Sequence, residues 1–393
     1  MSQSVFTSLP PLTLYVHLPW CARKCPYCDF NSHELKSPVP ETEYVDALIA
    51  DLEQDLPSVW GRVCHAVFIG GGTPSLFSPA AVDRLLSAVR ARLQLAPGAE
   101  VTLEANPGSS EADRFAGFRE AGINRLSIGV QSFNERHLES LGRIHDSHEA
   151  LSAADAAKAA GFDNFNLDLM FGLPGQSLAE AITDADTAVT SGAAHLSFYQ
   201  LTIEPNTVFH RFPPKLPDDD TIWQMQQQIK NLLAVHGYRQ YEVSAYARDG
   251  YRCRHNLNYW QFGDYLGIGA GAHAKITLPE GIERFAKVRN PRSYLEKASG
   301  EARIASRRRV EGDEAVFEFM LNALRLTEPV PAAMLQQRTG RTLASIGKVV
   351  QQARNDGLLE ITRGALGATE KGFRFLNDLL ERFLPEDAVR SSP

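Results

Sequence analysis

The sequence predicts an α/β fold in which an open, partial parallel (β/α)6 barrel of the TIM-like type precedes a mainly α-helical C-terminal domain. Two observations predict this fold. Six short segments rich in β-branched and aromatic residues recur between residues 13 and 201, and amphipathic helical patterns separate them. Parallel strands need helical crossovers, so the alternation indicates a parallel sheet. Six units are fewer than the eight that close a full barrel.

Each predicted strand is short and bounded by Gly, Pro or Asn. The six strands cover residues 13–17, 66–69, 101–104, 125–130, 165–169 and 196–201.

The helices between the strands are predicted from apolar periodicity and from residues that start or stop a helix. Leu48 and Leu52 share the apolar face of the first helix, which ends at Pro57. Ser78 and Pro79 provide an N-cap and a first-turn proline for the second helix. Further helices are predicted to begin near Ser110, Asp146 and Ser177, and glycines at 122 and 161 are predicted to end two helices.

The last third of the chain is predicted to be a separate, mainly helical domain. One predicted helix has Val316 and Phe319 on its apolar face, and a second has Ile346 and Val350. A hairpin near residues 357–361 and a last helix over 373–384 are predicted to follow. The basic run 307–309 is interpreted as a solvated linker. We divide the chain into an N-terminal extension (1–11), the barrel (12–240), a connecting segment (241–305), the C-terminal domain (306–384) and a frayed tail (385–393).

Composition narrows the classes of function. The net charge of -7 over 393 residues argues against a nucleic-acid-binding protein, because such proteins carry dense basic faces. The N-terminus lacks a signal-peptide pattern, and no apolar stretch is long enough to span a membrane. Five cysteines, three of them clustered, are not typical of a disulfide framework. We therefore expect a cytoplasmic protein.

Cys21, Cys25 and Cys28 lie within eight residues, a spacing typical of metal or cluster ligands. A structural zinc site needs four protein ligands, so three thiolates favour an iron–sulfur cluster with one iron left open for a further ligand. The alternative is a zinc site with His17 or His33 as the fourth ligand. Cys64 is interpreted as a small core residue.

Polar residues and glycines occur where the predicted strands end. Gly70–Gly72 and Thr73 follow the second strand, Glu104 ends the third, Gln131 follows the fourth and Asp168 lies near the end of the fifth; Tyr199 and Gln200 lie near the end of the sixth. Ligands bind at the carboxyl ends of parallel strands, so we expect these residues to surround one site. For Glu104 and Asp168, pairing with a buried donor is the alternative.

These motifs together resemble a known family. The C-x3-C-x2-C spacing followed by Gly-Gly-Gly-Thr-Pro resembles the radical S-adenosylmethionine (SAM) superfamily. The segments LYVHLPWC, CPYCDFNSH, FIGGGTPS, GVQSF, DLMFGLPGQ and HNLNYW more narrowly resemble the oxygen-independent coproporphyrinogen III oxidase group and, within it, the haem chaperone (HemW) branch.

The resemblance implies cofactors and the residues that hold them. Cys21, Cys25 and Cys28 would bind a 4Fe-4S cluster whose open iron is chelated by SAM, and an electron donor would reduce the cluster. The SAM site implied by the resemblance contains Tyr15, Tyr27, Gly71, Gly72, Thr73, Glu104, Gln131, Arg143 and Asp168. Cleavage of SAM would yield a 5′-deoxyadenosyl radical, and the protein would supply orientation and exclusion of water.

The chain departs from the oxidase pattern at Phe30, where the oxidases carry a fourth cysteine, and in its short N-terminus. We expect Phe30 to be a core aromatic behind the cysteine loop. Coproporphyrinogen III oxidase activity is therefore not expected.

The segment 254–260 matches the H-N-x-x-Y-W motif of the haem chaperone branch, which implies that His255 is a haem ligand. Cys253 is an alternative ligand, and a structural turn is the alternative role of the motif. The role of the small-residue loop 267–273 stays open, either approaching a cofactor or turning tightly.

The favoured function is a haem chaperone that binds haem, a 4Fe-4S cluster and SAM and passes haem to an acceptor protein, with peripheral membrane association where that acceptor is membrane-bound. The alternative is a radical SAM enzyme acting on coproporphyrinogen III or another substrate. The C-terminal region resembles the winged-helix-like tail of the group, and its charge favours a lid or docking role over DNA binding.

Overall fold

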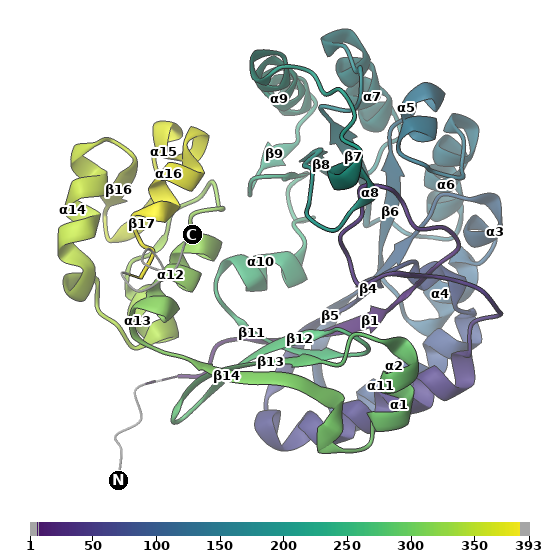
Figure 1. Cartoon of the computed structure of the whole chain (residues 1–393), viewed down its shortest axis with the longest axis horizontal. Coiled ribbons are helices and arrows are strands. Elements are labelled where there is room, and N and C mark those ends of the chain that lie inside the picture. Colours follow the sequence, from purple (N-terminus) through teal and green to yellow (C-terminus); the bar gives the residue numbers. More distant parts are fainter. Residues whose placement is uncertain (1–5, 7, 386–393) are drawn as a thin grey trace.

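The computed structural model describes residue 6 and residues 8–385. Within this part of the chain, twelve strands form one curved, open sheet (Figure 1). In spatial order the strands are β14 (Ile304–Val310), β13 (Gly281–Lys287), β12 (His273–Leu278), β11 (Asp264–Ile268), β1 (Leu12–Leu18), β4 (Val63–Gly71), β5 (Gln94–Ala105), β6 (Arg125–Gln131), β7 (Phe165–Phe171), β8 (His195–Gln200), β10 (Ala245–Ala247) and β9 (Arg239–Gln240). The six predicted strands are confirmed as β1 and β4–β8, which pair in parallel.

Helices connect the parallel strands and lie on the outside of the sheet (Figure 1). They are α1 (Glu41–Asp55), α2 (Pro79–Arg92), α3 (Ser109–Ala112), α4 (Phe115–Ala121), α5 (Glu135–Ser140), α6 (Ser147–Ala159) and α7 (Leu178–Thr190). Helices α8 (Val208–Arg211) and α9 (Asp219–Val235) follow β8, and the Phe209 amide of α8 donates to Pro26 O of the cysteine loop at 3.0 Å. The predicted starts are confirmed: Ser78 caps α2 by accepting a hydrogen bond from the Ala81 amide, and Asp146 and Ser177 form capping boxes on α6 and α7.

The segment 241–305 adds further strands to the same sheet. Strand β11 pairs in parallel with β1, and β12, β13 and β14 follow in antiparallel order. Helices α10 (Arg254–Trp260) and α11 (Pro291–Lys297) complete this segment. The glycine-rich loop 267–273 therefore turns at the carboxyl end of a parallel strand, at the same edge of the sheet as the predicted site residues.

The prediction of a solvated linker at residues 307–309 is wrong. These arginines lie in β14, which forms the edge of the sheet and pairs with β13. Their side chains are exposed, and Arg308 pairs with Glu314 and Glu318. A basic edge strand keeps exposed backbone from pairing with another chain, so a charge run can belong to a strand.

The C-terminal region consists of α12 (Gly312–Ala323), β15 (Val330–Pro331), α13 (Ala333–Thr339), α14 (Gly347–Asn355), the hairpin β16 (Leu359–Thr362) and β17 (Ala365–Ala368), α15 (Glu370–Arg374) and α16 (Leu376–Glu381). Helices α12, α13 and α14 beside the three-stranded sheet of β15, β17 and β16 have the arrangement of a winged helix. The predicted single helix over 373–384 is wrong, because Phe375 has φ -109° and ψ 50° and separates α15 from α16. The predicted frayed tail lies outside the described residues from 386 onward.

Two hydrophobic cores support these regions. The larger one lies between the sheet and its helices, and the second one fills the C-terminal region. Leu257 and Trp260 of α10 pack against the second core, and α10 lies between the barrel and the C-terminal region (Figure 1). No helix among the described residues has the length and apolar character needed to cross a bilayer.

Candidate functional site

The cysteine loop is closed at its base by a short parallel pair of strands, β2 (Trp20–Cys21) and β3 (His33–Glu34). Inside the loop, the Lys24 ammonium donates to the carbonyl oxygens of Phe30 (3.4 Å) and Ser32 (3.2 Å). The Asn31 amide donates at 2.9 Å to Ala270 O, in the loop after β11. The glycine-rich loop therefore holds the cysteine loop in place. At position 271 a Cβ atom would lie 2.4 Å from the Asn31 amide nitrogen, which explains its glycine.

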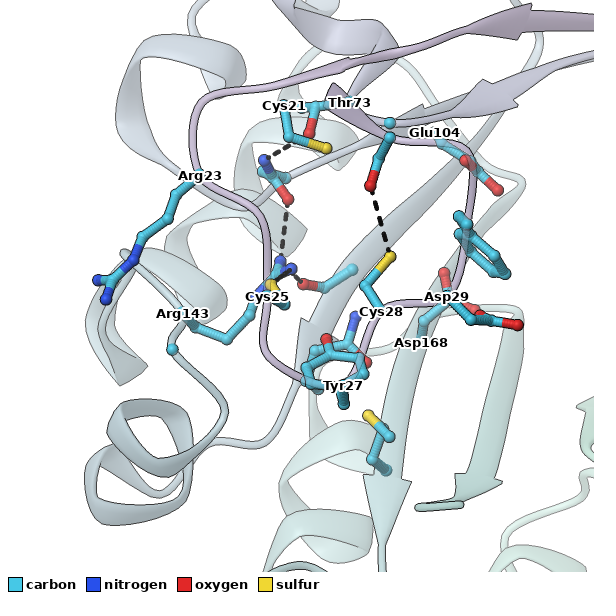
Figure 2. A pocket seen from close by; sticks show the side chains of 18 of the residues that line it. Cys21, Arg23, Cys25, Tyr27, Cys28, Asp29, Thr73, Glu104, Arg143 and Asp168 are labelled. Atoms are coloured by element: carbon cyan, nitrogen blue, oxygen red, sulfur yellow. Dashed lines mark hydrogen bonds between the residues drawn. The ribbon is translucent and has the colours of Figure 1, made fainter. Parts of the chain in front are cut away.

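The three predicted ligands Cys21, Cys25 and Cys28 line one cavity of about 380 Å³. Figure 2 shows them along one loop, with Arg143 reaching toward them and Arg23 directed outward. Of the other predicted residues, the structure brings Tyr27, Gly71, Gly72, Thr73, Glu104, Gln131, Arg143 and Asp168 to the same cavity; Tyr199 and Gln200 also line it. The expectation that residues at the carboxyl ends of the parallel strands surround one cavity is confirmed.

The glycines after β4 are packed tightly against the cysteine loop. A Cβ on Gly72 would lie 2.4 Å from Trp20 O, and one on Gly71, whose φ is 120°, would lie 2.6 Å from the His17 ring. The Gly72 amide donates to Leu18 O at 2.8 Å, and the Thr73 amide donates to Trp20 O at 2.7 Å. The glycines are thus required for the approach of the two loops, whatever a ligand adds.

Glu104 and Asp168 face the cavity from β5 and β7. Glu104 accepts a hydrogen bond from the Gly71 amide at 2.9 Å. Burial, opposed by that hydrogen bond and helped by the charge of Asp168, raises the pKa of Glu104 to about 7. Asp168 accepts from Ser127 and Asn166, each at 2.9 Å, and burial raises its pKa as well. Two carboxylates in one interior favour a ligand that donates hydrogen bonds or carries positive charge.

Gln131 and Arg143 form another side of the cavity. Gln131 has a φ of 69°, a left-handed conformation that is costly for a side-chain-bearing residue and typical of functional sites. Arg143 donates to the Asn106 side chain (2.9 Å) and to Gly129 O (2.6 Å), and its guanidinium lies 3.7 Å from Cys25 Sγ. A fixed cation beside the cysteines stabilises the negative charge that thiolate ligands bring.

Tyr15 and His255 are not among the residues that line this cavity. Tyr15 donates or accepts a hydrogen bond with His17 Nδ1 (2.9 Å) and stacks on Phe68, with ring centroids 6.3 Å apart. The His255 ring is 2% exposed and stacks on Phe68 at 5.0 Å, with Tyr259 at 4.8 Å edge-on. Burial lowers the pKa of His255 to about 3.

The alternative haem ligand, Cys253, is also enclosed. It is fully buried, and burial raises the pKa of its thiol to about 12. Its Sγ lies 3.5 Å from a Glu100 oxygen that also accepts from the amides of Arg254 and His255. Glu100 therefore caps the start of α10, so the segment is a helix and not the turn of the structural alternative. Among the described residues, neither ring nitrogen of His255 has a hydrogen-bond partner.

The prediction that Phe30 is a core aromatic is wrong, because its side chain is 60% exposed at the mouth of the cavity. The loop turns outward between Cys28 and Ser32, and the side chain that packs inward is that of Asn31. An aromatic residue beside a cluster motif gives no sequence signal for its direction, since loops lack a fixed side-chain period.

The donor set fits a cluster. All five cysteines are free, and Cys21, Cys25 and Cys28 share one anchored loop. His17, a candidate fourth ligand for zinc, already uses both ring nitrogens, on Tyr15 and on Asn31 O (2.9 Å). Among the described residues, no three His, Cys, Asp or Glu side chains converge on one point as for a single metal ion. Cubane cluster thiolates need no such convergence, because each binds its own iron.

Sequence reasoning missed several polar residues in the barrel interior. Asn106 joins Arg143 to Thr73 through its side-chain oxygen and nitrogen. The Asn166 side chain donates to Asp168 at 2.9 Å, and its oxygen accepts from His195 Nδ1 at 2.7 Å. The other ring nitrogen of His195, Nε2, lies 2.8 Å from the Tyr241 hydroxyl. Asn106 lies two residues after Glu104, directly after the end of the same strand, so its position could have identified it as a site residue. Asn166 and His195 lie inside or at the start of their strands, where position gives no such indication.

Comparisons with known proteins identify the family of this chain. A family model described as "Radical SAM superfamily" matches residues 15–188, and one described as "HemN C-terminal domain" matches residues 310–375. A protein of Escherichia coli (strain K12) named "Heme chaperone HemW" is 52% identical over 379 residues, covering 96% of this chain and 99% of that protein. Its namesake from Haemophilus influenzae is 48% identical over 384 residues, with the same coverage, and that from Bacillus subtilis is 33% identical over 379 residues, covering 95% and 99%.

A solved structure has the same fold. Coproporphyrinogen III oxidase (HemN) from Escherichia coli superposes with a TM-score of 0.80 at 22% identity, covering 95% of this chain and 90% of that one. Fold and cysteine loop together define a radical SAM protein. Within that superfamily, the chain belongs to the HemW family, whose curated members are named heme chaperones.

Proposed function

We propose that the protein is a haem chaperone that carries a 4Fe-4S cluster on Cys21, Cys25 and Cys28, binds SAM in the adjoining cavity and passes haem to an acceptor protein. The observation that carries the cofactor part is the meeting of three free thiols with the strand-end residues in one cavity. The haem part is supported by the printed names of relatives that match nearly the whole chain. Free cysteines accord with a cytoplasmic, reducing compartment.

The residues around the cavity have separate tasks in this proposal. The anchored cysteine loop holds the cluster, and Arg143 balances its charge. Glu104 accepts hydrogen bonds from the ribose hydroxyls of SAM, while Gly71–Thr73 binds the methionyl end. Gln131 and Asp168 complete the pocket, and Tyr27, which lies between Cys25 and Cys28 in the chain, covers one side of it. When bound, the cluster supplies one electron to the sulfonium of SAM.

The chaperone is distinguished from a porphyrinogen-processing enzyme by one experiment. The cluster is reconstituted anaerobically, reductant and SAM are added, and haem uptake and coproporphyrinogen III decarboxylation are measured separately. We expect one haem per chain, transferable to an apo acceptor, and no decarboxylation. Turnover of coproporphyrinogen III without haem affinity would favour the enzyme and reject the chaperone.

The raised pKa of Glu104 predicts that SAM binding weakens as the pH falls. Both oxygens of Glu104 can accept from the two ribose hydroxyls only when the carboxyl is ionised, so SAM binds the deprotonated form better and binding releases a proton below pH about 7. Affinity should fall by up to about tenfold for each pH unit below that value. Isothermal titration calorimetry of the reconstituted protein between pH 6 and 7.5 measures this effect.

Glu104→Gln should bind SAM weakly and lose most of the pH dependence in this range. Glu53→Gln, which changes an exposed carboxylate paired with Arg92, is the matched control and should behave like the wild type. An unchanged pH profile in Glu104→Gln would assign the proton to another group.

A further inference from the structure

Three large apolar side chains stand exposed around the mouth of the cavity. They are Phe30 (60% exposed) from the cysteine loop, Ile144 (61%) from the connection between α5 and α6, and Tyr199 (41%) from the end of β8. We call these three residues the apolar rim. They come from three separate elements and line the same opening, so their exposure is a property of the site rather than of one loop.

The backbone of Phe30 is held from several sides. Its carbonyl oxygen accepts from the Lys24 ammonium and, at 2.7 Å, from the Ser32 amide. The next residue, Asn31, is tied to Ala270 O and Arg289 O, each at 2.9 Å. The exposed Phe30 ring is therefore held by an anchored loop. Exposing this apolar ring to water has a free-energy cost, and the fixed backbone gains no conformational freedom that would offset that cost.

Ile144 and Tyr199 are held as firmly. The neighbours of Ile144 are the half-buried Arg143, which donates to Gly129 O at 2.6 Å, and the buried His145, whose ring lies 3.0 Å from Val130 O. Tyr199 lies in β8, in register with Met170 of β7. A tyrosine hydroxyl is uncharged near pH 7 at its ordinary pKa of about 10, so Tyr199 offers a neutral ring.

We propose that the apolar rim is the haem-binding site of this protein, with Phe30, Ile144 and Tyr199 contacting the face of the macrocycle. This inference rests on the proposed function and adds the place where the cargo binds. A tetrapyrrole has a flat apolar face and two carboxylates at one edge. The rim matches the face, and the exposed Arg23, which lines the same mouth and points outward in Figure 2, matches a carboxylate.

The structure favours this place over the H-N-x-x-Y-W segment. His255 is enclosed by Phe68 and Tyr259 and is 2% exposed, so a macrocycle reaches it only after α10 moves. The rim favours haem over an acceptor protein as its occupant, because three side chains around an opening are much less than the roughly 1,000 Å² that a specific protein interface buries.

The test is a haem titration of the reconstituted protein, followed by absorption and by quenching of intrinsic fluorescence. Ile144→Ser and the double variant Phe30→Ser, Ile144→Ser are compared with Trp60→Ser. Trp60 is 81% exposed and precedes β4, at the opposite edge of the sheet, so this variant removes an equally apolar surface far from the rim. Because Phe30 is near the cysteines, cluster content is measured for each variant, and Ile144→Ser keeps the test valid if the double variant loses its cluster.

We expect the double variant to bind haem at least about tenfold more weakly, Ile144→Ser to show a smaller loss, and Trp60→Ser and His255→Ala to bind as the wild type does. Equal losses in Ile144→Ser and Trp60→Ser would show non-specific adsorption and overturn the inference. So would loss of binding in His255→Ala alone, which places haem at α10. Rim variants that bind haem normally but fail to pass it on would assign the rim to the acceptor. Failure of the wild type to bind haem would instead reject the proposed function.

Discussion

Cys25→Ala should abolish the brown iron–sulfur absorption of the reconstituted protein while leaving the fold intact. Cys25 is partly exposed at the cavity, so its removal creates no void in the core. The expected loss of cluster affinity exceeds the roughly 10- to 100-fold that removing an outer hydrogen-bond partner costs a metal site, because a direct ligand is lost. Iron and acid-labile sulfide per chain, with circular dichroism as the measure of folding, test this result.

The matched control is Cys64→Ala. Cys64 is fully buried in β4, and its thiol donates to Ala66 O at 3.3 Å, far from any ligand role. This variant should keep the full iron and sulfide content. If Cys25→Ala retained its cluster, or if both variants lost it equally, the assignment of the three-cysteine loop would be wrong.

Lys287→Met should destabilise the protein by about 3–5 kcal/mol, because it leaves buried carboxylates without their partner. Lys287 is fully buried in β13 and pairs with Asp51 and Asp55 of α1, which also pair with the buried Arg303. Asp51 further accepts from the Gly269 amide at 3.1 Å, so the cluster of charges ties α1 to the loop that holds the cysteine loop. Urea unfolding at pH 7 measures the loss.

A pH series separates charge from packing in this variant. Burial already raises the pKa of Asp51 against the pull of Lys287, and removal of the lysine raises it further. When the pKa of a carboxyl is higher in the folded protein than in the unfolded chain, the folded protein becomes less stable as the pH rises. The deficit of Lys287→Met should therefore shrink toward pH 5. Arg84→Met, which breaks an exposed pair with Asp46, should cost less than about 1 kcal/mol. A pH-independent deficit in Lys287→Met would point to packing instead.

Much of the barrel and of the cavity was predictable from local signals. The strands β1 and β4–β8 were visible as short apolar segments, and caps at Ser78, Asp146 and Ser177 marked the helix starts. Strand ends then located Glu104 and Asp168, because parallel strands place their carboxyl ends at one edge. These patterns depend on residues close together in the sequence, so they can be recognised without knowledge of the tertiary structure.

Apart from the direction of Phe30 in its loop, the wrong predictions concern contacts between distant segments. The edge strand at residues 307–309 has no apolar alternation, since its pairing with β13 alone makes it a strand. Tyr15 carries the right motif position but faces Phe68 and His17 instead of the cavity. The break at Phe375 and the interior network through Asn166 likewise depend on tertiary packing. Such packing leaves no periodic pattern of apolar residues in the sequence.

The chemistry proposed for the centre rests on local motifs: three cysteines at fixed spacing, a glycine-rich turn and polar strand ends resemble those of a family that implies a cluster with a ligand beside it. The direction of individual side chains was decided by the tertiary structure. It turned Phe30 outward onto a rim with Ile144 and Tyr199, and it enclosed His255 among aromatic rings. The reason is physical, since covalent spacing limits which ligands can meet, whereas burial and exposure depend on what the rest of the chain packs against.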